Sequence, residues 1–216
     1  MVKEAKYIVI TEVLLIVMSC ILWKLFHWRG FLLAGVFFVF IAVMTLCFFR
    51  DPKRHIAEGH RIVVSPADGK IVRIDETAHL PFSETPLKTV SIYLSLWNVH
   101  INRVPIAGKV ISLNYRRGRF YPSFHKAAPK VNEQNTIGIE GKWGVVFFRQ
   151  IAGLIARRIV CHLRIGDHVK RGDRFGMIIF GSRVEFYLPE SVDLLVSVGE
   201  RVWGGESIIG VFRHDA

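Results

Sequence analysis

A serine, a histidine and an aspartate lie in three separate segments of the sequence, and together they could carry out nucleophilic chemistry. Ser182 lies between an apolar run and an alternating one, His100 lies in Asn98-Val-His-Ile-Asn-Arg-Val-Pro105, and Asp68 lies in Ser65-Pro-Ala-Asp-Gly-Lys70. A serine hydroxyl is a weak nucleophile until a neighbouring base takes its proton, and a histidine held by an aspartate can act as that base. The three residue types therefore predict a reactive Ser182.

Taken singly, each of these residues also has a simpler structural interpretation. Asp68 precedes a glycine, a common arrangement in turns because the carboxylate hydrogen-bonds to the local backbone. His100 could be a satisfied histidine near a strand end, and Ser182 an ordinary strand residue. A related segment, Pro105–Lys109, has Ala107 at the position of Asp68, so the turn itself does not require a carboxylate. The functional interpretation gains weight from the occurrence of all three segments in one chain.

Residues 53–216 predict a mainly β domain with few short helices. Short runs rich in Val, Ile, Leu, Phe and Tyr are separated by Gly, Pro and Asp, and no long helical periodicity is present. Two segments recur in the sequence: Gly166–Asp173 returns as Gly199–Glu206, and Pro66–Val72 returns as Pro105–Ile111. Turns of this kind resemble those of the barrel-sandwich in biotinyl and lipoyl carrier domains. With two copies of each, they predict quasi-symmetric hairpins.

Residues 1–52 predict a membrane anchor made of two helices, at about 7–26 and 30–49. The second segment has twenty residues without a charge, enough to cross a hydrocarbon core of about 30 Å. A short basic tip with Lys24 and Arg29 joins the two segments, so we expect a transmembrane helical hairpin with its tip anchored at the interface.

The distribution of basic residues predicts the orientation of this hairpin. The side opposite the tip carries five of them: Lys3, Lys6, Arg50, Lys53 and Arg54. By the positive-inside bias, both ends of the hairpin should face the cytoplasm, which puts the β domain on the cytoplasmic side of the cell membrane.

Two features of the first segment have alternative interpretations. Glu12 is either an interfacial residue one or two turns inside the helix or a polar residue with a role in the membrane. Val17–Cys20 loosely resembles a lipoprotein cleavage site, but the second apolar segment and the basic tip argue against secretory processing.

Several segments resemble the phosphatidylserine decarboxylase family, in the shorter branch found in bacteria and archaea. They are Ser65–Gly69, Asn98–Pro105, Phe180–Arg183, Phe48–Arg54 and Phe124–Asn135. In that family the bond between the glycine and the serine breaks itself, and the serine becomes a pyruvoyl group. The resemblance thus implies cleavage between Gly181 and Ser182, with the C-terminal chain 182–216 as a partner of the larger chain.

The resemblance also implies the reaction, the decarboxylation of phosphatidylserine to phosphatidylethanolamine. The pyruvoyl ketone would form a Schiff base with the serine amine of the lipid and accept the electrons released with carbon dioxide, without a metal or pyridoxal phosphate. Ser182, His100 and Asp68 are the implied catalytic residues. The lipid tails are left open, diacyl or archaeal ether chains as in archaetidylserine.

The sequence departs from the family pattern at two positions. Gln134 replaces the usual arginine, which puts in doubt any ion pair of that arginine. Arg103 occupies the place at which the long-branch enzymes carry a second histidine. His100 could therefore serve both self-cleavage and turnover, or His125 or His162 could contribute.

Charge favours a surface that faces an anionic membrane. The net charge is +11, and Thr85 to Asn132 contains no Asp or Glu. The basic residues of this stretch are Lys88, Arg103, Lys109, Arg116, Arg117, Arg119, Lys126 and Lys130. Cations near an anionic leaflet attract the protein to it, so the candidate substrate-binding residues are Asn102, Arg103, Arg116, Arg117 and Arg119. A nucleic-acid surface would suit the same charge, but the membrane hairpin favours lipid.

Two other classes of protein remain as alternatives. One is a non-catalytic, membrane-tethered adaptor or carrier built on the barrel-sandwich, which would need neither Ser182 nor His100. The other is a serine hydrolase that uses Asp68, His100 and Ser182, against which no Gly-x-Ser-x-Gly motif is present and a strand follows the serine. Cys20, Cys47 and Cys161 have no metal-site spacing and are expected to be apolar fillers. A homo-oligomer is left open.

Overall fold

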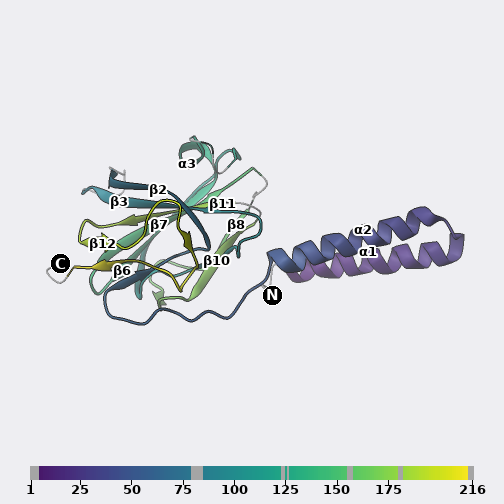
Figure 1. The fold of residues 1–216 in the computed structure, drawn as a ribbon, viewed down its shortest axis with the longest axis horizontal. Helices are drawn as coiled ribbons and strands as arrows, with labels where there is room; N and C mark the ends of the chain where they lie inside the picture. The colour runs from purple at the N-terminus through teal and green to yellow at the C-terminus, as the bar shows by residue number, and fades with distance from the viewer. Residues whose placement is uncertain are drawn as a thin grey trace. The chain divides into compact units, whose positions relative to one another are not determined.

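The chain forms two compact units, Met1–Pro52 and Lys53–Ala216, in a computed structural model. The structure describes residues 5–78, 85–122, 125, 127–154, 158–179 and 182–213. The first unit is a pair of helices, and the second is built mainly from strands joined by loops (Figure 1). The predicted fold class, a mainly β domain with an N-terminal helical hairpin, is confirmed.

The hairpin consists of α1 (Ala5–Phe26) and α2 (Arg29–Phe48), both long and apolar enough to cross a membrane by length and composition. Small and polar residues lie where the two helices meet: Ala5, Glu12 and Ser19 are buried on α1, and Gly35 and Thr45 on α2. The Thr45 hydroxyl donates a hydrogen bond of 2.7 Å to Glu12 Oε1. Polar side chains between apolar helices commonly pair in this way, so Glu12 is a helix–helix contact.

In the described part of the β domain there are fourteen strands and one short helix. They are β1 (Ile62–Val64), β2 (Gly69–Ala78), β3 (Leu87–Leu94), β4 (Ile101–Arg103), β5 (Gly108–Arg116), α3 (Ala128–Val131), β6 (Gln134–Gly141), β7 (Gly144–Ala152), β8 (Arg158–Cys161), β9 (His168–Val169), β10 (Arg174–Ile179), β11 (Ser182–Leu188), β12 (Val192–Leu194), β13 (Arg201–Val202) and β14 (Ile208–Phe212).

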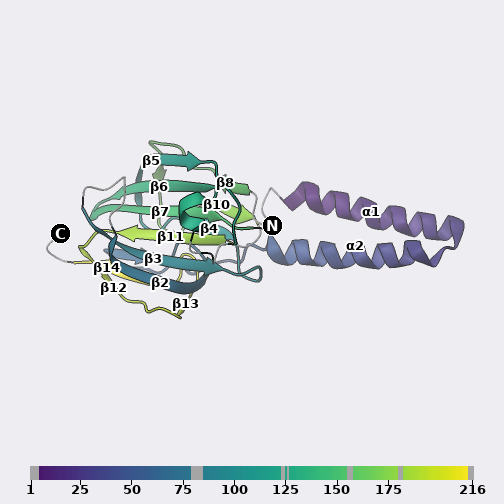
Figure 2. The same cartoon turned by 90° about the horizontal axis from the view of Figure 1, so that it is seen from above.

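The strands form one large sheet and two small ones. The large sheet has the order β13-β2-β3-β11-β7-β6-β5-β9, and Figure 2 shows its longer strands side by side. The small sheets have the orders β1-β14-β12 and β4-β10-β8. Strand β11 lies in the middle of the large sheet, where Val184, Phe186 and Leu188 alternate into the core and are completely buried. The apolar side chains follow the period of two of a strand, and the opposite face is covered too, because Glu185 and Tyr187 are also buried.

The recurring segments form quasi-symmetric hairpins that pack on each other. Gly166 donates its N–H to Val110 O, and Gly199 donates its N–H to Ile71 O, both at 2.8 Å. Both glycines have positive φ angles, +96° and +97°, a conformation that favours glycine. Each Gly-Asp/Glu turn thus packs on one copy of the other repeat, and the two copies are structurally equivalent.

Candidate active site

Ser182 is the first residue of β11, at one end of the large sheet. It pairs with Leu94, the last residue of β3, on one side and with Ala152, the last residue of β7, on the other. The residue is buried, and its Oγ has no hydrogen-bond partner among the described residues. Buried hydroxyls in folded proteins are almost always paired, so this orphaned group marks Ser182 as a candidate for chemistry. Gly181, the other half of the expected cleavage site, lies outside the described residues.

His100 directly precedes β4, and the backbone connects it to the strand that leads to Ser182. The Ile178 N–H donates to His100 O at 3.4 Å, four residues before the serine. The imidazole is buried, and its Nδ1 lies 2.9 Å from Asn98 O. A carbonyl oxygen can only accept, so Nδ1 carries a proton, and in the neutral form of the ring the lone pair is on Nε2. This is the tautomer that a general base needs.

Asp68 directly precedes β2, at the same end of the sheet. Two residues further on, Lys70 pairs with Tyr93, and Tyr93 pairs with Arg183. The carboxylate accepts hydrogen bonds from the Gly204 N–H at 2.8 Å and from Arg54 Nη2 at 2.6 Å. Burial raises the pKa of the Asp68 carboxyl above its usual range, and the Gly204 amide and the Arg54 guanidinium partly offset this effect. The expected pairing of Asp68 with His100 stays a prediction.

The internal repeat gives a test of whether Asp68 is needed for the turn. The Gly205 N–H donates to Ser65 O, and in the other copy the Gly172 N–H donates to Val104 O, again both at 2.8 Å. The same backbone contacts therefore form in the copy that has Ala107 in place of the aspartate. Since the fold does not require a carboxylate here, its presence in one copy favours a functional role.

Arg54 also belongs to this site, a role that the sequence did not indicate, although this residue ends the Phe48–Arg54 segment. Its guanidinium bridges two carboxylates, Asp68 at 2.6 Å and Glu206 at 2.9 Å, and its side chain is only 9% exposed. The residues that follow it run along the loop that contains Glu206: His55 N–H donates to Glu206 Oε1, and Ala57 N–H donates to Gly205 O. The segment from Arg54 to Ala57 thus runs along the loop that contains Glu206 and reaches Asp68 within the β domain.

Asn102 and Arg103 lie in β4, and both side chains are buried. Gln150 Nε2 donates to Asn102 Oδ1 at 2.9 Å, while Asn102 Nδ2 has no partner among the described residues. Gln150 pairs in register with Val184, two residues after Ser182, so Asn102 is linked to the strand that carries the serine. Arg103 Nη1 donates to Gly172 O at 2.9 Å, and its backbone N–H donates to Pro66 O, next to the Asp68 turn.

The other basic candidates, Arg116, Arg117 and Arg119, lie at the end of β5 or just after it. Arg116 has hydrogen-bond partners that differ from the surroundings of the other two. With the Gln134 amide oriented so that both its polar atoms are satisfied, its oxygen accepts from Arg116 at 2.8 and 3.1 Å. Arg116 also donates to Lys130 O. Arg116 therefore supplies a guanidinium beside Gln134, where the family has an arginine. Arg117 and Arg119 are exposed.

The register of the sheet places the end of β5 at the same end of the sheet as Ser182. Arg116 pairs with Gln134, Gln134 with Ile151, and Ile151 with Arg183. The alternative bases, His125 and His162, are both exposed. Within the described ranges, no group of three or more His, Cys, Asp or Glu side chains is arranged to hold a metal ion.

Comparisons with known proteins agree on one family. The family model described as phosphatidylserine decarboxylase matches residues 41–210. A phosphatidylserine decarboxylase proenzyme of Syntrophus aciditrophicus is 50% identical over 171 residues, which cover 79% of this chain and 80% of the relative. One of Geotalea uraniireducens is 38% identical over 206 residues, which cover 95% of this chain and 92% of the relative.

These matches show that the protein is a decarboxylase, that is, a carboxy-lyase of phospholipid metabolism that is made as a proenzyme. The chain belongs to the phosphatidylserine decarboxylase family.

Proposed function

We propose that the chain decarboxylates phosphatidylserine to phosphatidylethanolamine with a pyruvoyl group that it makes from its own Ser182. The observation that carries the proposal is the buried Ser182 Oγ, which has no partner among the described residues, at a strand end that adjoins the His100 and Asp68 segments. A hydroxyl held ready for reaction fits this environment better than one with a purely structural role, since a structural hydroxyl would be paired.

In self-cleavage, the Ser182 hydroxyl attacks the Gly181 carbonyl and the peptide C–N bond breaks, which leaves an ester. Loss of the Cα proton then expels the Gly181 carboxylate and leaves dehydroalanine at position 182. Addition of water and release of ammonia give the ketone. One water is consumed in total, and no oxidant or reductant is needed. His100 is the proposed base for the hydroxyl, since its neutral ring has the lone pair on Nε2.

The N–H groups of Asn102 Nδ2 are the proposed donors to the oxyanion that forms on the attacked carbonyl. They are buried and have no partner among the described residues, and a donor fixed in advance stabilises developing negative charge. Gln150 holds the amide in place by its hydrogen bond to Asn102 Oδ1.

The pyruvoyl group would supply the electron sink for loss of carbon dioxide. The chain's own residues would do the rest. His100 is the proposed acid that returns a proton to the product carbon, and Arg103 and the basic residues at the end of β5 are proposed to hold the anionic headgroup. Since this carbon must be protonated in every turnover, His100 would act in decarboxylation as well as in self-cleavage.

The cleaved C-terminal chain, residues 182–216, is proposed to stay bound. Strand β11 pairs with β3 and β7, and β14 pairs with β1 and β12. Separation would expose Val184, Phe186 and Leu188, which are completely buried, at a cost of about 1.5–3 kcal/mol each. Cleavage therefore leaves the sheet intact.

The hairpin is proposed to anchor the enzyme in the cell membrane, with the β domain on the cytoplasmic side. The basic residues at Arg50, Lys53 and Arg54 support this orientation. Anchoring suits a substrate that cannot readily leave the bilayer.

The direct test is conversion of phosphatidylserine by the purified full chain in bilayers. Phosphatidylserine labelled at the serine carboxyl should release labelled carbon dioxide and leave phosphatidylethanolamine. A Ser182→Ala chain is the matched control and should release none. Hydrolysis of an acyl ester in place of decarboxylation would favour a serine hydrolase.

A separate prediction concerns the exposed cations Arg117 and Arg119. Changing both to Gln should lower the rate on anionic vesicles several-fold at low salt and much less at high salt, because exposed charges are screened over about 10 Å at 0.1 M salt. Arg116 is kept, since it also holds Gln134 and Lys130. Self-cleavage should be unaffected.

The control for this variant changes two exposed lysines at the opposite end of the sheet, Lys109 and Lys142. Lys109 lies next to Gly108, which pairs with Gly141 at the far end of β5 and β6. The control should keep the full rate at every salt concentration. Equal losses in both variants would mean that only total charge matters, and an unchanged rate in the first would mean that Arg117 and Arg119 are simply solvated.

A further inference from the structure

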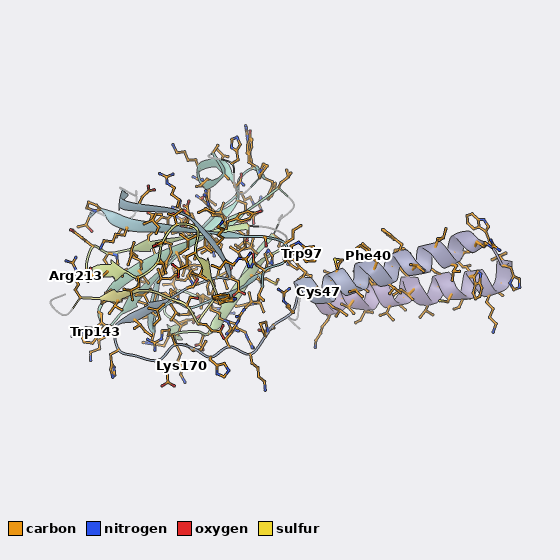
Figure 3. The ribbon with its side chains drawn as sticks, viewed as in Figure 1. Phe40, Cys47, Trp97, Trp143, Lys170 and Arg213 are labelled. Atoms are coloured by element: carbon orange, nitrogen blue, oxygen red, sulfur yellow. The ribbon has the colours of Figure 1, made fainter. Side chains whose placement is uncertain are left out.

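The three loops around the Ser182 end of the sheet carry exposed apolar side chains. Residue exposure is 46% for Leu96, 70% for Trp97, 56% for Leu154 and 37% for Tyr121. Trp97 projects from the β domain in Figure 3. We call these four residues the apolar rim.

The turn that carries Leu96 and Trp97 is tightly built. The Asn98 N–H donates to Ser95 O at 3.0 Å, and Asn98 Oδ1 accepts from both the N–H and the hydroxyl of Ser95, at 2.9 and 2.6 Å. Leu96 and Trp97 are therefore the two central residues of a locked turn. Such positions usually hold Gly, Pro, Asn, Asp or Ser, so a leucine and a tryptophan here need an explanation outside the turn.

This turn is joined to the proposed active site at both of its ends. Leu94, just before it, pairs with Ser182, and Asn98, at its end, accepts from His100 through its carbonyl oxygen. Whatever binds Leu96 and Trp97 thus lies close to the proposed nucleophile and base.

The other two residues of the apolar rim reach the same end of the sheet through Ala152, the other neighbour of Ser182. Leu154 follows Ala152 by two residues. Asn132 Nδ2 donates to both Ala152 O and Tyr121 O, at 2.7 and 2.8 Å, and the Tyr121 N–H donates back to Asn132 Oδ1. The asparagine therefore fixes Tyr121 beside the end of β7.

We propose that the apolar rim is a membrane-docking surface that inserts into the headgroup region of a bilayer and presents the Ser182 end of the sheet to lipid. This inference deepens the proposed function and rests on it, because a bilayer lipid is the substrate. Exposed apolar groups at the mouth of a site indicate a binding surface, and tryptophan and tyrosine prefer the membrane interface. The exposed cations Arg117 and Arg119, just before Tyr121, add the charge that an anionic leaflet attracts.

The first test separates membrane docking from catalysis by the form of the substrate. The full chain with Leu96→Ser and Trp97→Ser is compared with the unaltered chain on phosphatidylserine in bilayers and on a short-chain phosphatidylserine dissolved as monomers. We expect a rate per matured molecule about ten-fold lower on bilayers and unchanged on monomers. The control, Ile165→Ser with Leu195→Ser, removes apolar groups of similar exposure, 65% and 59%, from loops elsewhere in the domain and should match the unaltered chain on both substrates.

The second test measures docking without any activity. In bilayers that contain brominated lipids, part of the tryptophan fluorescence of the unaltered chain should be quenched. The Trp97→Phe chain should no longer show the quenching that is due to Trp97. The Trp143→Phe chain, altered in the turn between β6 and β7, should show the same loss of intensity to brominated lipids as the unaltered chain. If Trp97 is unquenched, or if bilayer and monomer rates fall equally, the apolar rim does not dock on the membrane. An inactive unaltered chain with a quenched Trp97 would instead contradict the proposed function and leave the docking surface standing.

Discussion

A chain with His100→Ala should remain almost entirely uncut, because Ser182 then lacks the base that takes its proton. Loss of a positioned acid or base costs about 10²–10⁴-fold in rate. Asp68→Ala should slow self-cleavage in the same way if the two residues act as a pair. Both effects are read from the fraction of cut chain over time on a denaturing gel.

The two variants should differ after maturation. Activity of the small cut fraction, normalised to the number of cut chains, should be lost again in His100→Ala, since His100 also protonates the product carbon. It should be largely retained in Asp68→Ala. The matched controls are His168→Ala, an exposed histidine in β9, and Asp167→Asn, a turn aspartate that accepts from the Arg164 N–H. Normal cutting in His100→Ala would move the base role to His125 or His162.

Arg54→Ala should slow self-cleavage at neutral pH and shift its dependence on pH. The guanidinium is one of the two groups that offset the effect of burial on the Asp68 carboxyl. Its removal raises the pKa of Asp68 further, and the uncompensated Glu206 carboxylate acts in the same direction. The ionised form of Asp68 is then reached only at higher pH, so the acid limb of the rate profile should move upward. For each pH unit by which the acid limb moves, the rate of self-cleavage at a fixed pH on that limb should fall ten-fold.

The controls for Arg54 separate its charge from its place in the linker. Arg54→Lys keeps the charge and should keep the acid limb near its original position. Arg171→Ala removes the hydrogen bond of 2.9 Å to Gly59 O, further along the same linker, without touching Asp68. It should leave the pH profile in place. A rate that falls equally at every pH in Arg54→Ala would show that Arg54 acts only as a structural residue.

The repeats and the alternation of apolar residues were enough to predict the β domain. Local rules fix both features: glycine at positive φ in each turn, and a period of two in β11. The prediction therefore extended to the equivalence of the two copies, in which Gly166 and Gly199 make corresponding hydrogen bonds.

The partners of the site residues could not be predicted in the same way. Arg54 is far from Glu206 in the sequence and meets it only because the linker runs along the Gly204-Gly205 turn. The guanidinium of Arg116 lies beside Gln134 because β5 and β6 pair in that register. Side-chain partners of this kind depend on tertiary register, and a single sequence contains no local signal for them. The Phe48–Arg54 segment resembled the family, but this resemblance did not indicate what Arg54 does.

The intact mass of the purified full chain under denaturing conditions tests the central claim most directly. The account predicts two chains, one ending at Gly181 and one of 35 residues that begins at position 182 with a pyruvoyl group in place of the serine. Ser182→Ala should give one chain with the full mass. An unaltered chain that decarboxylates phosphatidylserine while it remains a single unmodified polypeptide would contradict the account.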